Sequence, residues 1–256
     1  MFNLLKYEFI KKYKLISITL ISALVLNLYL LTRGIAGSSS FLLLFPLVLS
    51  VLYVSDVIRT YSDDLNKKSG YMLFMTPNSG YKIIMSKLAA AVIEGIGMLF
   101  IYFLFILING AFIIYQTRRY VDINEVMNDI NTLLSGNIGI NLGHVFVFLF
   151  AVLVFVIGFI VTVYTAMTIR KSIFSEIKFG GFLSFIIFIG LNWALTYVSG
   201  EFYSIVSPEY NSFVNVTTVS ASELLVIMFP VIAVSIIQSI ILTLCSGYLL
   251  EKKINL

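Results

Sequence analysis

Apolar residues in this chain gather in long runs, and polar residues collect between the runs. The runs predict six membrane-spanning helices, at about 15–32, 40–58, 88–112, 143–169, 179–198 and 224–250. Each run is close to the about 20 residues that an α-helix needs to cross a bilayer. Lipid offers no partner to an unpaired backbone group, so continuous helices are expected. The pattern therefore predicts an all-α polytopic membrane protein that forms a single transmembrane domain over 1–256.

The segment 1–14 precedes the first run and mixes apolar with charged residues. Its apolar side chains recur at helical spacing between charged ones; they are Leu4, Leu5, Phe9, Ile10 and Tyr13, set among Lys6, Glu8, Lys11 and Lys12. This spacing predicts an amphipathic helix lying on the inner leaflet. A plain positive anchor that fixes the topology is the other interpretation, and the two are compatible.

Composition narrows the class of protein. Hydrophobic residues make up 59% of the 256 residues and charged residues 12%, whereas soluble domains carry about 25% charged residues. A soluble globular enzyme, a disordered protein and a disulfide-stapled secreted domain are therefore excluded. The single cysteine, Cys245, allows no intrachain disulfide, and with the single histidine, His144, it cannot form a structural zinc site of His and Cys ligands.

Basic residues predict the orientation. With the amino terminus inside, only Arg33, Arg118 and Arg119 of the 17 basic residues fall outside, and cytoplasmic loops carry the excess of Lys and Arg. Both termini are therefore predicted to be cytoplasmic, with outer loops at 113–142 and 199–222. This arrangement explains the net charge of +4 without a nucleic-acid partner. In the first outer loop, residues 121–134 have the spacing of an amphipathic helix.

The longest cytoplasmic loop, 59–82, contains a predicted short helix. Ser62 can cap it, Asp63 and Asp64 favour the positive end of a helix, and Lys67 and Lys68 fall in its later turn.

An apolar patch follows in the same loop, at Tyr71–Met75, and includes Leu73 and Phe74. Such a patch either meets a protein partner or lies on the lipid interface.

Charged residues inside the spans are few. Glu94 lies within the third span, and Asp56, Arg59 and Lys87 are expected near it because spans two and three are neighbours in sequence and antiparallel. A structural ion-pair cluster is one interpretation, and a proton or substrate contact is the other. Polar groups in or near the spans, which could pair between helices or line a path, are Asn27, Asn109, Asn192 and Gln238.

Motifs for catalysis are absent from the sequence. No Gly-Lys pair exists, so the chain has no P-loop for ATP, and neither a His-Glu-x-x-His helix nor a Gly-x-Ser-x-Gly elbow occurs. We therefore expect a non-enzymatic chain that carries no cofactor or metal of its own.

The order of these features resembles the permease subunits of ABC-2 type exporters. The likeness lies in Asp63-Asp64, then Leu73-Phe74-Met75-Thr76-Pro77, Tyr81-Lys82-Ile83-Ile84 and Ser86-Lys87, and in the opening segment with Leu4, Lys6 and Glu8. Small Phe- and Ile-rich permeases of this kind are similar to exporters of antimicrobial or cytolytic peptides, such as phenol-soluble modulins.

The resemblance implies a mechanism. Two permease subunits, identical or different, would form the pathway, and a cytoplasmic ATPase that binds ATP and Mg would dock under each. Residues 1–14 would be an elbow helix, and residues 61–76 would be a coupling helix contacting the ATPase. Its coupling residues would be Asp63, Asp64, Lys67, Lys68, Tyr71, Leu73 and Phe74. The cargo would be an amphipathic peptide or a hydrophobic substrate.

The sequence leaves three other classes of membrane protein open. A stand-alone ion-coupled carrier or channel would use Glu94. A membrane enzyme lacks the expected motifs, and a regulatory subunit that transports nothing is compatible with the sequence.

Overall fold

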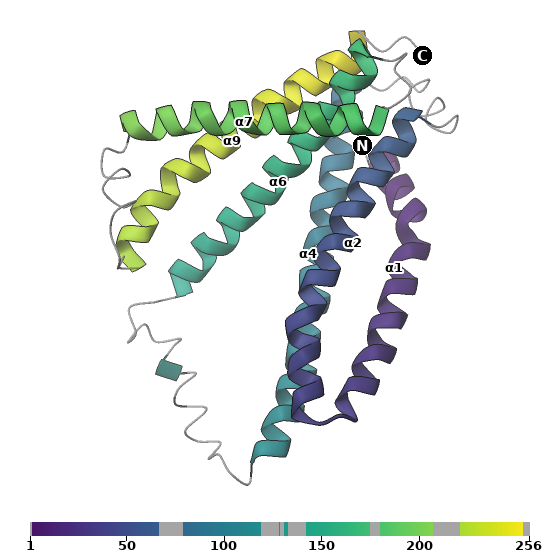
Figure 1. The fold of residues 1–256 in the computed structure, drawn as a ribbon, viewed down its shortest axis with the longest axis vertical. Coiled ribbons are helices and arrows are strands. Elements are labelled where there is room, and N and C mark those ends of the chain that lie inside the picture. The colour runs from purple at the N-terminus through teal and green to yellow at the C-terminus, as the bar shows by residue number, and fades with distance from the viewer. Residues whose placement is uncertain are drawn as a thin grey trace. The chain divides into compact units, whose positions relative to one another are not determined.

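The structure is a computed structural model that describes residues 2–66, 79–118, 128, 131–132, 142–174, 180–206 and 221–252. Its long helices are α1 (Phe2–Leu31), α2 (Ile35–Asn66), α4 (Gly80–Thr117), α6 (Leu142–Ile173), α7 (Gly180–Val206) and α9 (Ala221–Lys252) (Figure 1). All six are long and apolar enough to cross a membrane. The prediction of an all-α, multi-span membrane protein is thereby confirmed.

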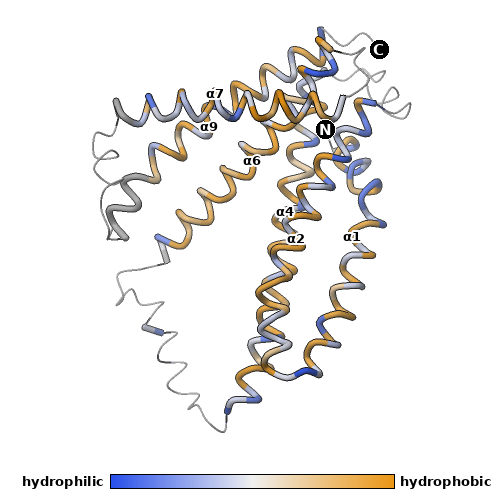
Figure 2. The backbone as a smooth tube through the Cα atoms, viewed as in Figure 1, coloured by the Kyte–Doolittle hydropathy of each residue, from blue (hydrophilic) through white to orange (hydrophobic). Residues whose placement is uncertain are grey.

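Large apolar side chains are exposed along these helices rather than gathered on one face. Phe146 and Phe155 of α6 and Trp193 of α7 are each at least 70% exposed. Figure 2 shows apolar residues running along the helices, with the polar ones concentrated toward many of the helix ends. A helix that is apolar all round needs an apolar environment, which for this chain is lipid.

The amino-terminal boundary differs from the prediction. The expected elbow, 1–14, and the expected first span, 15–32, form one uninterrupted helix, α1. No Gly or Pro separates the two segments in the sequence, so nothing local breaks the helix.

The predicted helix start at Ser62 is also wrong. Residues 61–66 continue α2 to its end at Asn66. Asp63 and Asp64 therefore lie in the last turn of a helix and not in the first. The remainder of the predicted coupling helix, and the outer helix expected at 121–134 except for Asn128, Asn131 and Thr132, lie outside the described residues.

Two further helices are longer than their predicted spans. The third span, expected at 88–112, is the middle of α4, which begins at Gly80. The outer loop expected at 199–222 begins as helix, because α7 continues to Val206.

The chain divides into two compact units. Unit 1 consists of 1–60 and 86–129, and unit 2 consists of 61–85 and 130–256. Unit 1 thus holds α1 and most of α2 and α4, whereas unit 2 holds α6, α7 and α9 with the end of α2 and the beginning of α4.

A tight turn connects α1 to α2 in unit 1. Gly34 has φ of +76°, the left-handed conformation that glycine adopts without a steric penalty. The amides of Arg33 and Gly34 donate to the carbonyls of Leu30 and Leu31 at 3.0 and 3.1 Å. These bonds join residues three apart and tighten the end of α1, so that α1 and α2 form a hairpin.

Three aromatic rings form the core of unit 1. Phe41 and Phe45 lie one turn apart on α2 and stack with their ring centroids 4.7 Å apart. Phe105 of α4 meets both edge-on, at 5.2 and 5.1 Å. Ala23 of α1 completes the cluster. Edge-to-face pairs add to the burial of apolar area, so this cluster joins all three helices.

Hydrogen bonds between side chains and the facing helix hold α2 against α4. Ser38 donates to Asn109 Oδ1 at 2.7 Å, and both side chains are fully buried. Tyr102 and Tyr53 each donate to a backbone carbonyl of the facing helix, at 3.0 and 2.9 Å. One predicted polar group, Asn109, therefore pairs between helices.

Unit 2 is organised around α6, which packs against both α9 and α7. Tyr61, at the end of α2, stacks on Tyr164 of α6 at 4.2 Å and bonds Thr168 at 2.5 Å. At the beginning of α4, Tyr81 lies directly against Gly247 of α9. The ends of α2 and α4 are therefore anchored on α6 and α9.

Candidate functional site

A cluster of charged side chains is buried between the helices of unit 1. Its members, hereafter the charge cluster, are Glu8 and Lys12 of α1, Asp56 of α2, and Lys87 and Glu94 of α4. Each is less than 9% exposed. Buried charged residues are rare unless they are paired, and an ionisable residue within a span is a candidate functional residue.

The charged groups pair between helices. Lys12 Nζ lies 2.8 Å from Asp56 Oδ2 and donates a hydrogen bond to Glu94 Oε2. Lys87 Nζ donates to Glu8 Oε1 at 2.6 Å. Every pair thus ties α1 to α2 or to α4. Removing one partner of a buried pair strands the other charge, and such losses cost about 3–5 kcal/mol.

Sequence reasoning found part of this cluster. It expected Asp56, Lys87 and Glu94 together, and the structure buries all three in the cluster. Arg59 was expected there too, but its side chain is exposed and forms no ion pair among the described residues.

Glu8 and Lys12 were missed as members of the site. Their spacing of four residues places them on one face of α1, where opposite charges often pair with each other along the helix. In the structure each pairs with a residue of another helix instead. The sequence did contain a signal for their burial, because Glu8 and Lys12 lie on the same face of α1 as the apolar Leu5 and Ile16. A charge pair exposed to solvent would be expected on the opposite, polar face.

Two carboxyl oxygens in the cluster accept no hydrogen bond from the residues that the structure describes. One is Glu94 Oε1, and the other is Asp56 Oδ2. The Asp56 oxygen lies 2.8 Å from Lys12 Nζ, so it has a Coulombic partner in a direction unsuited to a hydrogen bond. Lys12 therefore contacts two carboxyl groups with a single positive charge, and it satisfies only part of their hydrogen-bonding capacity.

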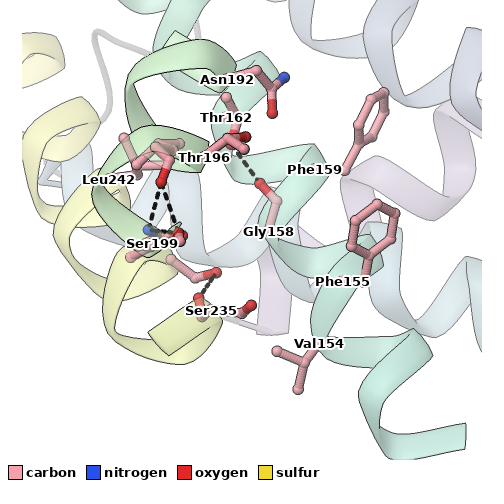
Figure 3. Close-up of a pocket in the computed structure, with 13 residues that line it drawn as sticks. Val154, Phe155, Gly158, Phe159, Thr162, Asn192, Thr196, Ser199, Ser235 and Leu242 are labelled. Atoms are coloured by element: carbon pink, nitrogen blue, oxygen red, sulfur yellow. Dashed lines mark hydrogen bonds between the residues drawn. The ribbon is translucent and has the colours of Figure 1, made fainter. Parts of the chain in front are cut away.

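A second polar site lies within unit 2, where α6, α7 and α9 enclose a pocket of about 160 Å³ (Figure 3). Hydroxyl and amide side chains contributed by all three helices line it; these are Thr162, Asn192, Thr196, Ser199, Ser235, Gln238 and Ser239. Phe155 and Phe159 form part of the apolar wall. None of the described residues that line the pocket is charged, so it suits an uncharged hydrogen-bonding group.

Gln238 organises one side of this pocket. Its amide nitrogen donates to Ser199 Oγ at 2.7 Å and to the Leu195 carbonyl at 3.3 Å, which links α9 to α7. Asn192 lines the same pocket. Gln238 and Asn192 are two of the polar residues that were predicted either to pair between helices or to line a path. Ligand pockets usually measure about 300–1,000 Å³, so this one has room only for a small group.

The predicted coupling residues divide into two sets. Asp63 and Asp64 are half-buried and buried at the end of α2, and both make interactions. The neighbouring Asn66 accepts a hydrogen bond from Arg170 of α6 at 2.9 Å. The others, Lys67, Lys68, Tyr71, Leu73 and Phe74, lie outside the described residues.

In the part of the chain that the structure describes, no three His, Cys, Asp or Glu side chains are arranged to hold a metal ion. Comparison of the chain with models of known protein families, with curated proteins and with solved structures finds no match.

Proposed function

We propose that this chain is the permease subunit of an ATP-driven ABC exporter in a bacterial cell membrane. Two permease subunits would form the pathway, and a separate cytoplasmic ATPase would supply the energy. The cargo would be an amphipathic or hydrophobic substrate, and most narrowly a peptide toxin or antimicrobial peptide.

One observation carries the proposal. The helix α2 leaves its apolar stretch and ends at Asn66 with Asp63 and Asp64, and α4 begins at Gly80. The connection between two membrane-length helices is therefore short, and it contains the apolar patch Tyr71–Met75. A short, rigidly anchored connection is suited to pass the movement of a docked partner to both helices.

The anchoring of both ends supports the same mechanism. Tyr61 fixes the end of α2 on α6, and Gly80 and Tyr81 fix the beginning of α4 on α9. Movement of a partner docked on the connection between α2 and α4 would thus be transmitted to four helices, α2, α4, α6 and α9. The sequence has no P-loop, so nucleotide hydrolysis is assigned to the partner.

A stand-alone ion-coupled carrier is the second candidate. The observation in its favour is the buried carboxyl group of Glu94, one oxygen of which has no hydrogen bond. The ion pair between Glu94 and Lys12 weighs against the carrier. A buried carboxylate that is held by a fixed cation stabilises the fold, and releasing it to bind a transported ion would leave the lysine unpaired.

The test is a pull-down of the tagged chain from native membranes in mild detergent, with bound proteins identified by mass spectrometry. We expect a stoichiometric ATPase that carries a P-loop. Substituting Leu73→Asp with Phe74→Asp should remove it, because buried apolar contacts would be replaced by charges. The matched control, Ile123→Asp with Val126→Asp on the predicted outer side, should retain it.

Purification without any ATPase would contradict the proposal. Transport that proceeds without ATP and is abolished by Glu94→Gln would establish the carrier instead. Loss of the ATPase in the control pair as well as in the loop pair would show that the effect is general misfolding and not docking.

A further inference from the structure

The charge cluster contains more carboxyl groups than ammonium groups. Glu8, Asp56 and Glu94 supply three carboxyl groups, and Lys12 and Lys87 supply two ammonium groups. Lys87 has Glu8 as a partner, whereas Lys12 lies against both Asp56 and Glu94. If all five groups were ionised, the cluster would keep one uncompensated negative charge away from water.

Hydrogen-bond donors fall short at the same place. Glu94 Oε1 and Asp56 Oδ2 are buried without a hydrogen bond, and these two carboxyl groups are the ones that share Lys12. A proton placed on either carboxyl group would supply the missing donor and remove the surplus charge. The surplus negative charge and the missing hydrogen-bond donors are separate observations, and a single bound proton would account for both.

Among the residues that the structure describes, the other cationic side chains of α1, α2 and α4, such as Lys11 and Arg59, are exposed. From α1 the charged group that contacts the two carboxyl groups is Lys12. Glu8 of α1 and Lys87 of α4 pair with each other. From α2, Tyr53 lies against Gly95, and its hydroxyl is bound to the Ala91 carbonyl at 2.9 Å. Lys12 and Lys87 are the buried cationic side chains among the described residues.

We propose that Asp56 and Glu94 form a proton-binding site, in which the two carboxyl groups share one proton at neutral pH and Lys12 neutralises the other charge. Two carboxylates at one site cannot both ionise readily, and one of them then keeps its proton. Burial reinforces this effect, because an unpaired charge is strongly disfavoured away from water.

A metal ion fits this site less well than a proton. Lys12 Nζ already occupies the position between the two carboxyl groups, and a second cation beside it would be repelled. Metal ions such as Mg²⁺ and Ca²⁺ also require six or more oxygen ligands, whereas the described residues contain no suitable group of three acidic, His or Cys side chains. The proton-binding site does not depend on which substrate the chain transports.

Infrared spectroscopy of the purified full-length chain in detergent tests the proposal directly. At neutral pH a free carboxyl group is ionised, so a carbonyl stretching band of a protonated carboxyl group reveals a bound proton. We expect this band in the wild-type chain and its loss in both Glu94→Gln and Asp56→Asn. Glu8→Gln and Asp64→Asn are the controls and should retain it. The absence of the band in the wild type, or its persistence in both site variants, would overturn the proposal.

Thermal unfolding of the same variants provides an independent measurement. Glu94→Gln removes the surplus carboxyl group and supplies an amide donor, so the unfolding temperature should stay equal or rise. Glu8→Gln makes the same chemical change but strands Lys87, so the unfolding temperature should fall. A fall of equal size in both variants would contradict a surplus carboxyl group at Glu94.

Salt titrations separate a proton from a metal ion. Sodium, potassium and magnesium chloride should stabilise the chain no more than choline chloride at the same ionic strength. A metal-specific rise in unfolding temperature that disappears in Glu94→Gln would replace the proton with that metal. None of these readouts involves transport, so the proton site and the exporter function can fail separately.

Discussion

At the scale of single residues, the most consequential feature is the position of Lys12. Its ammonium group contacts carboxyl groups from two other helices, and its side chain is 5% exposed. A lysine near the amino terminus would ordinarily serve as a topology signal at the membrane surface. Here it joins α1, α2 and α4, because those helices bring acidic groups to the face that it shares with Glu8.

Lys12→Met should strongly destabilise unit 1. The substitution leaves the carboxyl groups of Asp56 and Glu94 together without a cation, and the loss should be about 3–5 kcal/mol of unfolding free energy. Lys14→Met is the matched control, because Lys14 is exposed; its effect should stay within about 0.5 kcal/mol. Chemical or thermal unfolding in detergent measures both, and equal stability of the two variants would show that Lys12 bears no structural charge pair.

At the scale of elements, glycines decide where helices approach closely. Gly247 of α9 lies against the ring of Tyr81, so that a Cβ at this position would overlap the ring atoms. Small residues at helix contacts are a usual device in membranes, where packing rather than the hydrophobic effect drives helix association. This contact also fixes the beginning of α4, which follows the proposed coupling segment.

Gly247→Ala should loosen the contact between α4 and α9. The added methyl group has no room, and overpacking of this kind costs about 1–3 kcal/mol. Gly190→Ala on α7 is the control, because nothing lies within 4 Å of a Cβ there. That variant should be neutral or slightly more stable, since alanine favours a helix over glycine by about 1 kcal/mol.

The measurement for this pair is the unfolding temperature together with protection of the 61–85 segment against proteolysis. A decrease in both for Gly247→Ala and in neither for Gly190→Ala is the expected outcome. Equal behaviour of the two variants would mean that the ring of Tyr81 moves aside without cost.

At the scale of the whole molecule, six membrane-length helices and a one-sided distribution of basic residues define the topology to be tested. An even number of spans places both termini on the same side. The excess of Lys and Arg in the loops on that side predicts that this side is cytoplasmic.

Cysteine labelling in intact cells checks this orientation. Cys245 is first replaced by Ser, and single cysteines are then introduced as Arg119→Cys and Lys253→Cys. A membrane-impermeant maleimide should label the first variant in intact cells, and the second only after the membrane is permeabilised. Labelling of both after permeabilisation is the control for accessibility, and the reverse pattern in intact cells would invert the topology.

Part of the candidate site could be predicted because it depends on neighbours in sequence. Asp56 and Glu94 lie on consecutive antiparallel spans, so their proximity follows from chain order. Lys12 and Glu8 could not be assigned in this way, because the face of α1 that packs on α2 and α4 depends on the turn at Gly34 and on the aromatic cluster around Phe45. The pocket around Gln238 likewise depends on the packing of three helices.

The sequence by itself determined that this chain is helical and membrane-embedded, because lipid as a solvent demands long apolar runs with every backbone group paired, and both properties belong to local sequence. Tertiary structure alone decided that Glu8 and Lys12 of the amino-terminal segment face inward. It also decided that α2 continues through Asp63 and Asp64. These features depend on contacts between residues distant in the chain, where partners such as Glu94 and Tyr164 offset the cost of burying charged and polar groups.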